Sequence, residues 1–363
     1  MTARIDAPLL MVGSVPLSNE DEVFEKCGRL LGDAVFALPD GETGERAIWI
    51  TYEANHLFRP HPDIETLYQP TTPDGRKLQY PTHMFNFWIL RVREGVKEIR
   101  FESSPRIQAA IDSYRKFAQY KQKGKIPSRV RFQVCLPLTE SAIGMWFRPQ
   151  FAHDWPILAR AYEEVMGREL KRLFEAIPAE ELALQWDICV EVLDLERLLQ
   201  WTPKQGAWER FIEPVKRLSP SVPENVLIGY HLCYGTLGGW PMKEATDMAL
   251  SVKMANAIAK EAGRRVDYFQ MAGPRPNRSE EAEFYQPLQN LDIGEARVFL
   301  GLIHDLDGAD GLRMRVKRAR SYLPDFGISA ACGFGRRPGE EMEATIKTHR
   351  DDVDAFLTEL DRA

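Results

Sequence analysis

The chain has 363 residues, 44% of them hydrophobic, and a formal net charge of −6 with acidic and basic residues well mixed. This length allows one large domain or two, with enough apolar residues for a substantial core. The mixed charge excludes a polybasic face, so we expect neither nucleic acid nor an anionic membrane as a partner. No apolar run approaches the ~20 residues that span a bilayer, and the first residues lack a signal-peptide pattern. Because the five cysteines are too scattered for a disulfide framework, we expect a cytoplasmic protein.

Short apolar segments recur along the chain and end in loops, as buried parallel strands do. They cover residues 8–12, 34–38, 130–136, 182–190, 226–228, 266–271, 297–303 and 326–331. Helical patterns separate most of them, at residues 18–31, 105–123, 154–176, 243–262 and 340–360. Eight strands that mostly alternate with helices predict an α/β fold, a single (β/α)8 TIM barrel over residues 1–363.

One connection is too long and irregular to be a simple loop. Residues 47–95 follow the second predicted strand and are rich in Trp, Tyr, Phe, His and Pro. A long segment of this kind inside a compact domain is often functional, so we predict an insertion that caps the barrel. Its aromatic side chains would suit a flat ligand, or would serve only to pack the cap onto the barrel.

Polar residues stand at the ends of the predicted strands, where TIM barrels carry their chemistry. In chain order they are Ser14, Asp40 and Glu42, Thr139, Asp187, His231 and Cys233, Gln270, His304 and Cys332. A polar residue at the end of one strand arises easily by chance, but polar residues at the ends of all the strands arise rarely. The series therefore favours an active site at this mouth of the barrel.

The clearest pair in the series is His231 and Cys233, which stand two residues apart where the fifth strand becomes a loop. In an extended chain, residues i and i+2 point the same way, so the imidazole and the thiol can converge on one point. Nitrogen and sulfur ligands of this kind suit zinc, and closure of the barrel would bring Cys332 to the same mouth. The alternative is that both cysteines are buried as small hydrophobic residues.

At this point the motifs resemble the catalytic barrel of cobalamin-independent methionine synthase, in the uroporphyrinogen-decarboxylase/methionine-synthase-like superfamily. The segments that look like the family's motifs, in the same order, are Val12-Gly13-Ser14, Asp40-Gly41-Glu42, Gln185-Trp186-Asp187, His231-Leu232-Cys233, Ile303-His304 and Cys332-Gly333. The resemblance implies that Ser14, Glu42 and Asp187 bind an amino-acid substrate, with Asp187 holding its ammonium group. It also implies that His304 transfers a proton, and that zinc is held by His231, Cys233 and Cys332.

Three positions depart from the family pattern. Gln270 stands near the place of the family's Glu zinc ligand, and because a neutral amide replaces a carboxylate poorly, we expect at most a weak fourth ligand there. Ile188-Cys189 replaces the Glu-Pro that follows the substrate-binding Asp, and Asp40 replaces a His. The last two departures indicate a changed substrate.

Other residues are candidates by residue type and position. Arginines follow the sixth and eighth strands, where they suit a carboxylate or phosphate by paired hydrogen bonds: Arg275, Arg278, Arg336 and Arg337. Trp146, after the third strand, is a candidate wall for an aromatic ligand. His304 has an ordinary pKa near neutrality and suits a general acid or base, unless Asp305 or Asp307 simply satisfies it. Cys27, Cys135 and Cys189 are expected in the core.

The leading hypothesis is a zinc-dependent enzyme that transfers a methyl or other alkyl group to a thiol, with a small-molecule substrate and, by the resemblance, a folate-type donor. The alternative is a metal-independent lyase or decarboxylase using Asp187, His304 and the arginines on a carboxylated or phenolic substrate. Gln270 favours this alternative and the intact His/Cys/Cys trio opposes it. A catalytically idle binding protein would need neither the trio nor His304. The sequence indicates no oligomeric state.

Overall fold

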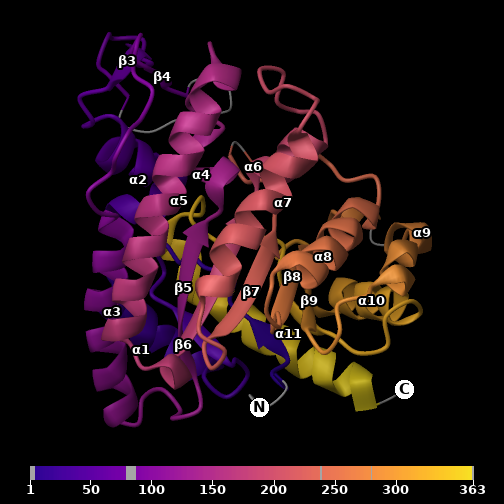
Figure 1. The fold of residues 1–363 in the computed structure, drawn as a ribbon. Helices are drawn as coiled ribbons and strands as arrows, with labels where there is room; N and C mark the ends of the chain where they lie inside the picture. Colours follow the sequence, from indigo (N-terminus) through magenta and orange to yellow (C-terminus); the bar gives the residue numbers. More distant parts are fainter. Residues whose placement is uncertain (1–4, 79–86, 238, 279, 362–363) are drawn as a thin grey trace.

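The computed structural model describes residues 5–78, 87–237, 239–278 and 280–361. Its central sheet has eight parallel strands in the order β1-β10-β9-β8-β7-β6-β5-β2. A parallel bridge between Leu9 of β1 and Val35, just before β2, brings the two outer strands together. The sheet therefore nearly closes on itself, and helices lie around it (Figure 1), so the prediction of a single TIM barrel is confirmed.

The barrel strands lie close to the predicted segments. They are β1 (Leu9–Leu10), β2 (Ala37–Pro39), β5 (Arg131–Pro137), β6 (Leu182–Ile188), β7 (Leu227–Leu232), β8 (Tyr268–Ala272), β9 (Arg297–Ile303) and β10 (Gly327–Ala330). The main difference is β7, which extends beyond its apolar run, because His231 is paired within the ladder rather than following it.

Five long helices match predicted ones: α1 (Glu20–Leu31), α3 (Pro105–Gln122), α5 (Phe151–Ala176), α8 (Ala249–Glu261) and α11 (Met342–Asp361). The sequence patterns missed α4 (Thr139–Ile143), α6 (Val190–Leu195), α7 (Ala207–Leu218), α9 (Ala282–Tyr285) and α10 (Gly308–Arg320). Short 3₁₀ turns complete the connections: η3 (Ala179–Glu181), η4 (Ser219–Ser221), η5 (Pro276–Arg278), η6 (Gln286–Asn290) and η7 (Gly339–Glu341). Of the helices in the described ranges, none is both long and apolar enough to cross a membrane.

The segment between β2 and α3 forms short helices and a hairpin. Its elements are η1 (Gly44–Ile48), α2 (Ile50–Glu53), η2 (Ala54–Phe58) and the antiparallel pair β3 (Ile64–Tyr68) and β4 (Ile89–Val92). The ring of Trp88 lies 5.7 Å from that of Trp146, and the Leu90 amide donates to the Trp146 carbonyl. The hairpin lies at the opposite end of the molecule from the chain termini (Figure 1). Three residues that the sequence analysis counts in the aromatic-rich insertion lie outside the described residues, namely Tyr80, His83 and Phe85.

The barrel interior changes from apolar to polar along the strands. An apolar cluster takes one residue from each of six strands: Leu10, Ala37, Ala183, Leu227, Tyr268 and Phe299. Gly229 makes room for the Tyr268 ring, since a Cβ at Gly229 would lie 2.2 Å from that ring. Because side chains on one face repeat every second residue, Gln185 and Gln270 lie above Ala183 and Tyr268 on the same inner face. The residues that follow Gln185 and Gln270 on this inner face reach the mouth of the barrel.

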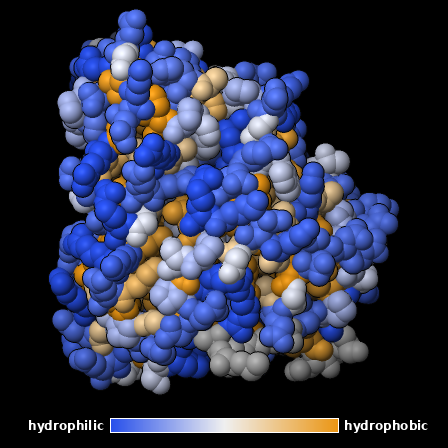
Figure 2. Space-filling view, in the orientation of Figure 1, coloured by the Kyte–Doolittle hydropathy of each residue, from blue (hydrophilic) through white to orange (hydrophobic). Residues whose placement is uncertain are grey.

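The outer surface is mainly hydrophilic, with hydrophobic residues scattered among polar ones on the face shown in Figure 2. This agrees with the well-mixed charges of the sequence.

Candidate active site

Three predicted metal ligands meet at the mouth of the barrel. The donor atoms of His231, Cys233 and Cys332 all lie within 4.8 Å of one another. The two sulfurs are 3.2 Å apart, and the Cys332 sulfur is 3.7 Å from Nε2 of His231. His231 and Cys233 are buried, and Cys332 is partly exposed. Closure of the barrel thus brings together side chains at the ends of β7 and β10.

The spacing of these atoms fits a zinc ion. With zinc–sulfur bonds of about 2.3 Å, a tetrahedral site holds two thiolates about 3.8 Å apart, and a thiolate and an imidazole nitrogen about 3.5 Å apart. The observed sulfur–nitrogen separation of 3.7 Å is close to its value, and the two sulfurs, which lie 3.2 Å apart, would separate by about 0.6 Å around the ion. The donor set also has the borderline-soft chemistry that zinc prefers.

Gln270 contacts the histidine instead of joining the metal ligands. Its side-chain oxygen is hydrogen-bonded to Nδ1 of His231. Its amide nitrogen donates to the Ser329 hydroxyl and to the Ala330 carbonyl, each at 3.1 Å. Both ends of the amide are therefore used inside the barrel, which contradicts the expectation of a weak fourth ligand. Since an amide oxygen only accepts, Nδ1 carries the proton and Nε2 presents its lone pair to the sulfurs.

The surroundings of the two thiols disfavour their thiolate forms. A hydrogen bond with the Cys189 thiol, together with burial, raises the pKa of Cys233 well above its usual value. A hydrogen bond with Cys233, followed by burial, does the same to the pKa of Cys332. Burial opposes a charge on His231, but its contacts with Cys332 and Asp187 raise its pKa overall. A bound cation would lower the pKa of both thiols and so favour their thiolate forms.

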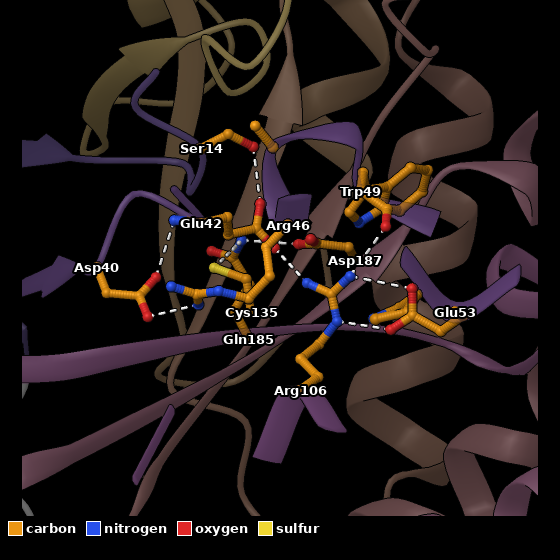
Figure 3. A network of polar contacts seen from close by, with 12 residues as sticks. Ser14, Asp40, Glu42, Arg46, Trp49, Glu53, Arg106, Cys135, Gln185 and Asp187 are labelled. Atoms are coloured by element: carbon orange, nitrogen blue, oxygen red, sulfur yellow. Dashed lines mark hydrogen bonds and ion pairs between the residues drawn. The ribbon is translucent and has the colours of Figure 1, made fainter. Parts of the chain in front are cut away.

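A second group of polar residues surrounds a buried guanidinium (Figure 3). Arg106 donates to Glu42 at 2.5 Å and to both carboxylate oxygens of Glu53 at 2.6 and 3.0 Å. The other oxygen of Glu42 accepts from the Ser14 hydroxyl at 2.7 Å. Glu42 has a left-handed backbone with φ of 49°, held by a hydrogen bond from its amide to Asp40. A non-glycine residue held in this way is common at functional sites.

Asp187 lies between these two groups of residues. It is 7% exposed, and one of its oxygens accepts from the Gln185 amide at 2.8 Å. Burial raises its pKa to about 7, while the nearby His231 lowers it and Glu42 raises it. Asp187 is also paired with His231 in the β6–β7 ladder. This carboxyl group can therefore face a cationic ligand beside the metal ligands.

One pocket, with a cavity of about 80 Å³, lies between the two groups of residues. Its polar lining includes Ser14, Glu42, Asp187, His231, Cys233, Cys332 and Arg336. Its apolar lining includes Ile48, Trp49, Ile50, Phe87, Met145, Leu193, Leu237 and Met242. Residues 48–51 and 87 belong to the insertion, so the insertion supplies part of the pocket wall.

His304 lines a neighbouring, more open pocket that shares Thr236, Cys332 and Arg336 with the first. Its Nε2 lies 2.8 Å from the carbonyl oxygen of Pro274 and must donate to it, which leaves Nδ1 as an acceptor. Burial, helped by the charge of Arg315, lowers the pKa of His304 to about 4. The surroundings of this ring therefore disfavour its charged form at near-neutral pH, and the ring lies beside the main pocket.

Two candidate substrate residues lie away from the main pocket. Trp146 is fully buried, donates from its indole to the Ala142 carbonyl, and packs against Phe87 and Trp88. The neighbouring Met145 lines the pocket instead, so the prediction for Trp146 chose the wrong side chain of this turn. Arg275 lines a separate small pocket, where its guanidinium lies 3.5 Å from the Trp240 carbonyl.

The other predicted arginines take different positions in the structure. Arg278 is paired with Glu281, and Arg337 is paired with Asp305. Arg336 lines both pockets, and burial lowers its pKa while the nearby Cys332 raises it. It is therefore the arginine best placed to meet an anionic part of a ligand.

Sequence reasoning missed three groups at this site. Arg106 and Glu53 were hidden because Arg106 lies 64 residues beyond Glu42, so that its contacts with Glu42 and Glu53 exist only after folding. Cys189 is buried in the core as predicted, and it also lines the pocket. Its position two residues after Asp187, the last residue of the Gln-Trp-Asp motif, was an available signal.

No protein-family model and no curated protein matches this sequence. Among solved structures, a B12-independent methionine synthase from a Shewanella species, in complex with selenomethionine, superposes with a TM-score of 0.65 at 12% identity, covering 98% of this chain and 99% of that one. A methyltransferase from Methanosarcina mazei superposes with a TM-score of 0.54 at 12% identity, covering 99% and 94%. The likeness to the catalytic barrel of cobalamin-independent methionine synthase that the sequence predicts is thus confirmed in the fold.

Proposed function

We propose that this protein is a zinc-dependent enzyme that transfers a methyl or other alkyl group to the sulfur of a small thiol. The observation that carries the proposal is the convergence of His231, Cys233 and Cys332 in one pocket with the spacing of a zinc site. The fold shared with a methionine synthase and a methyltransferase supports the same reaction class. A folate-type compound is the donor that the family resemblance suggests.

Zinc held by the three ligands would lower the pKa of a bound thiol, so that the acceptor is present as the nucleophilic thiolate at neutral pH. The chain supplies the rest of the environment. The hydrogen bond from Gln270 fixes His231 with Nε2 toward the sulfurs. Residues from the insertion line part of the wall of the pocket.

The polar wall suits a thiol that also carries charged groups. Asp187 can pair with an ammonium group, and Arg336 can pair with a carboxylate or another anion. Ser14 and Arg106 already occupy the two oxygens of Glu42. Glu42 therefore acts mainly by fixing the Ser14 hydroxyl at the edge of the pocket.

His304 would act as a proton acceptor in the adjoining pocket. Its low pKa keeps the ring neutral at physiological pH, and the Pro274 carbonyl fixes the proton on Nε2. Nδ1 is then the atom that can take a proton from a reacting group.

The metal-independent lyase alternative loses its main argument. It depended on Gln270 as a sign that the metal site had decayed, but Gln270 holds His231 in the orientation that a metal ligand requires.

An assay of product formation tests the proposal. Zinc-loaded protein is incubated with a methylated folate and a panel of thiols with and without amino and carboxylate groups, and thioethers are detected by mass spectrometry. We expect a thioether with wild type and Cys27→Ala, and none with Cys332→Ala. Equal product from Cys332→Ala, or release of CO₂ without consumption of a thiol, would contradict the proposal.

A further inference from the structure

The pocket contains a third sulfur beside the metal ligands. Cys189 follows β6 directly, and Ile188 pairs with Leu232 in the β6–β7 ladder, so the next residues on the two strands are Cys189 and Cys233. The Cys233 amide donates to the Ile188 carbonyl at 2.9 Å, which continues the pairing to this point. The Cys189 thiol interacts with that of Cys233, and both residues line the main pocket.

The backbone of Cys189 is held firmly at the start of α6. Its amide donates to the Ser141 hydroxyl at 3.0 Å, and the Val190 amide donates to the same oxygen at 3.1 Å. The hydroxyl in turn donates to the buried carboxyl of Glu191 at 2.5 Å. These contacts fix the main chain of Cys189 and leave its side chain at the pocket wall.

We infer that Cys189 is the fourth protein ligand of the metal centre, in place of a carboxylate. This inference rests on the proposed zinc function. The role is open because both ends of the Gln270 amide are already used. A site with three cysteines and one histidine matches a common zinc ligand set. Three thiolates around one divalent ion leave a net negative charge, and the nearby Arg336 offsets it.

The inference has a consequence for the reaction. Cys189 does not belong to the group of donor atoms within 4.8 Å of one another, so its sulfur must move to bind the metal. Four protein ligands close a zinc site, whereas catalysis needs an open position. An incoming thiol would therefore displace Cys189, the ligand that is held least closely. The proton of the incoming thiol would pass to the departing Cys189 sulfur, which conserves charge.

Cobalt substitution counts the thiolates directly, because each thiolate bound to Co²⁺ adds to a charge-transfer band in the near ultraviolet. Wild-type protein, freed of metal and titrated with Co²⁺, is compared with Cys189→Ala and with Cys27→Ala, a buried free cysteine on α1. We expect the band at saturation to fall by about one third in Cys189→Ala, as three thiolates become two. Cys27→Ala should keep the full band.

Cadmium-113 NMR of the wild-type protein gives the same count without any substitution, and it serves if Cys189→Ala does not fold. A resonance typical of three sulfur ligands supports the inference. An unchanged cobalt band in Cys189→Ala, or a cadmium resonance typical of two sulfur ligands, would overturn it and leave the zinc centre intact. Failure of the wild-type protein to bind one Co²⁺ at all would instead overturn the proposed function.

Discussion

The side-chain oxygen of Gln270 is hydrogen-bonded to Nδ1 of His231, so the opposite nitrogen of the ring faces the Cys332 sulfur at 3.7 Å. A glutamine on β8 thus fixes the orientation of a histidine on the neighbouring strand β7, which we propose as a metal ligand. Outer partners of this kind commonly change metal affinity by one to two orders of magnitude.

Replacing Gln270 should weaken metal binding without removing a ligand. We expect Gln270→Ala to lower zinc affinity by about 10- to 100-fold, because His231 loses the contact that fixes its proton and orientation. A competitive titration with a chromophoric chelator measures the effect. Gln133→Ala is the matched control, since Gln133 is also a buried barrel glutamine but donates to the Met11 carbonyl instead. Equal affinity in the two variants would contradict a role for Gln270.

Arg106 should be essential for stability because it neutralises two buried carboxylates, Glu42 and Glu53. Arg106→Met leaves both without a cation, so we expect the free energy of unfolding to fall by about 3–5 kcal/mol. Urea denaturation measures the change. Arg115→Met on the same helix removes only an exposed pair with Asp112 and should cost less than about 1 kcal/mol. A similar fall in the free energy of unfolding in both variants would contradict a stabilising role for the buried ion pairs of Arg106.

His304 should remain neutral well below pH 6.5. With its pKa lowered to about 4, its imidazole carbon protons should titrate near pH 4 in the NMR spectrum, assigned by their absence in His304→Gln. The unfolded ring binds a proton more readily than the folded one, so this histidine makes the fold lose stability as pH falls from about 6.5 to about 4. His304→Gln should flatten that part of the stability profile. A resonance that titrates near 6.5 would contradict the proposed neutral ring.

Much of this architecture could be predicted from the sequence. The strand β9 lies where the seven residues from Arg297 to Ile303 predict it, because a continuous buried run gives a clear signal. The convergence of His231, Cys233 and Cys332 could be predicted as well, since it follows from the i, i+2 spacing of the first two residues and from the closure of the barrel.

Other features depend on contacts that a linear pattern does not contain. Helix α7 was missed because Pro214 lies inside it, and α10 because Gly311 and many basic residues hide its buried face. The guanidinium of Arg315 in α10 is fully buried against Asp307 and the Leu302 carbonyl, which no hydrophobic pattern indicates. For the same reason, the role of Gln270 was predicted wrongly from its residue type alone.

The most direct test of the account is the zinc content of protein purified without added metal. We expect about one zinc per chain in wild type and in Cys27→Ser, and a loss of most of it in Cys233→Ser and in Cys332→Ser. Circular dichroism should show that all four proteins remain folded. Folded wild-type protein without zinc, even after incubation with the metal, would contradict the metal centre proposed here. Undiminished zinc in both Cys233→Ser and Cys332→Ser would contradict it as well.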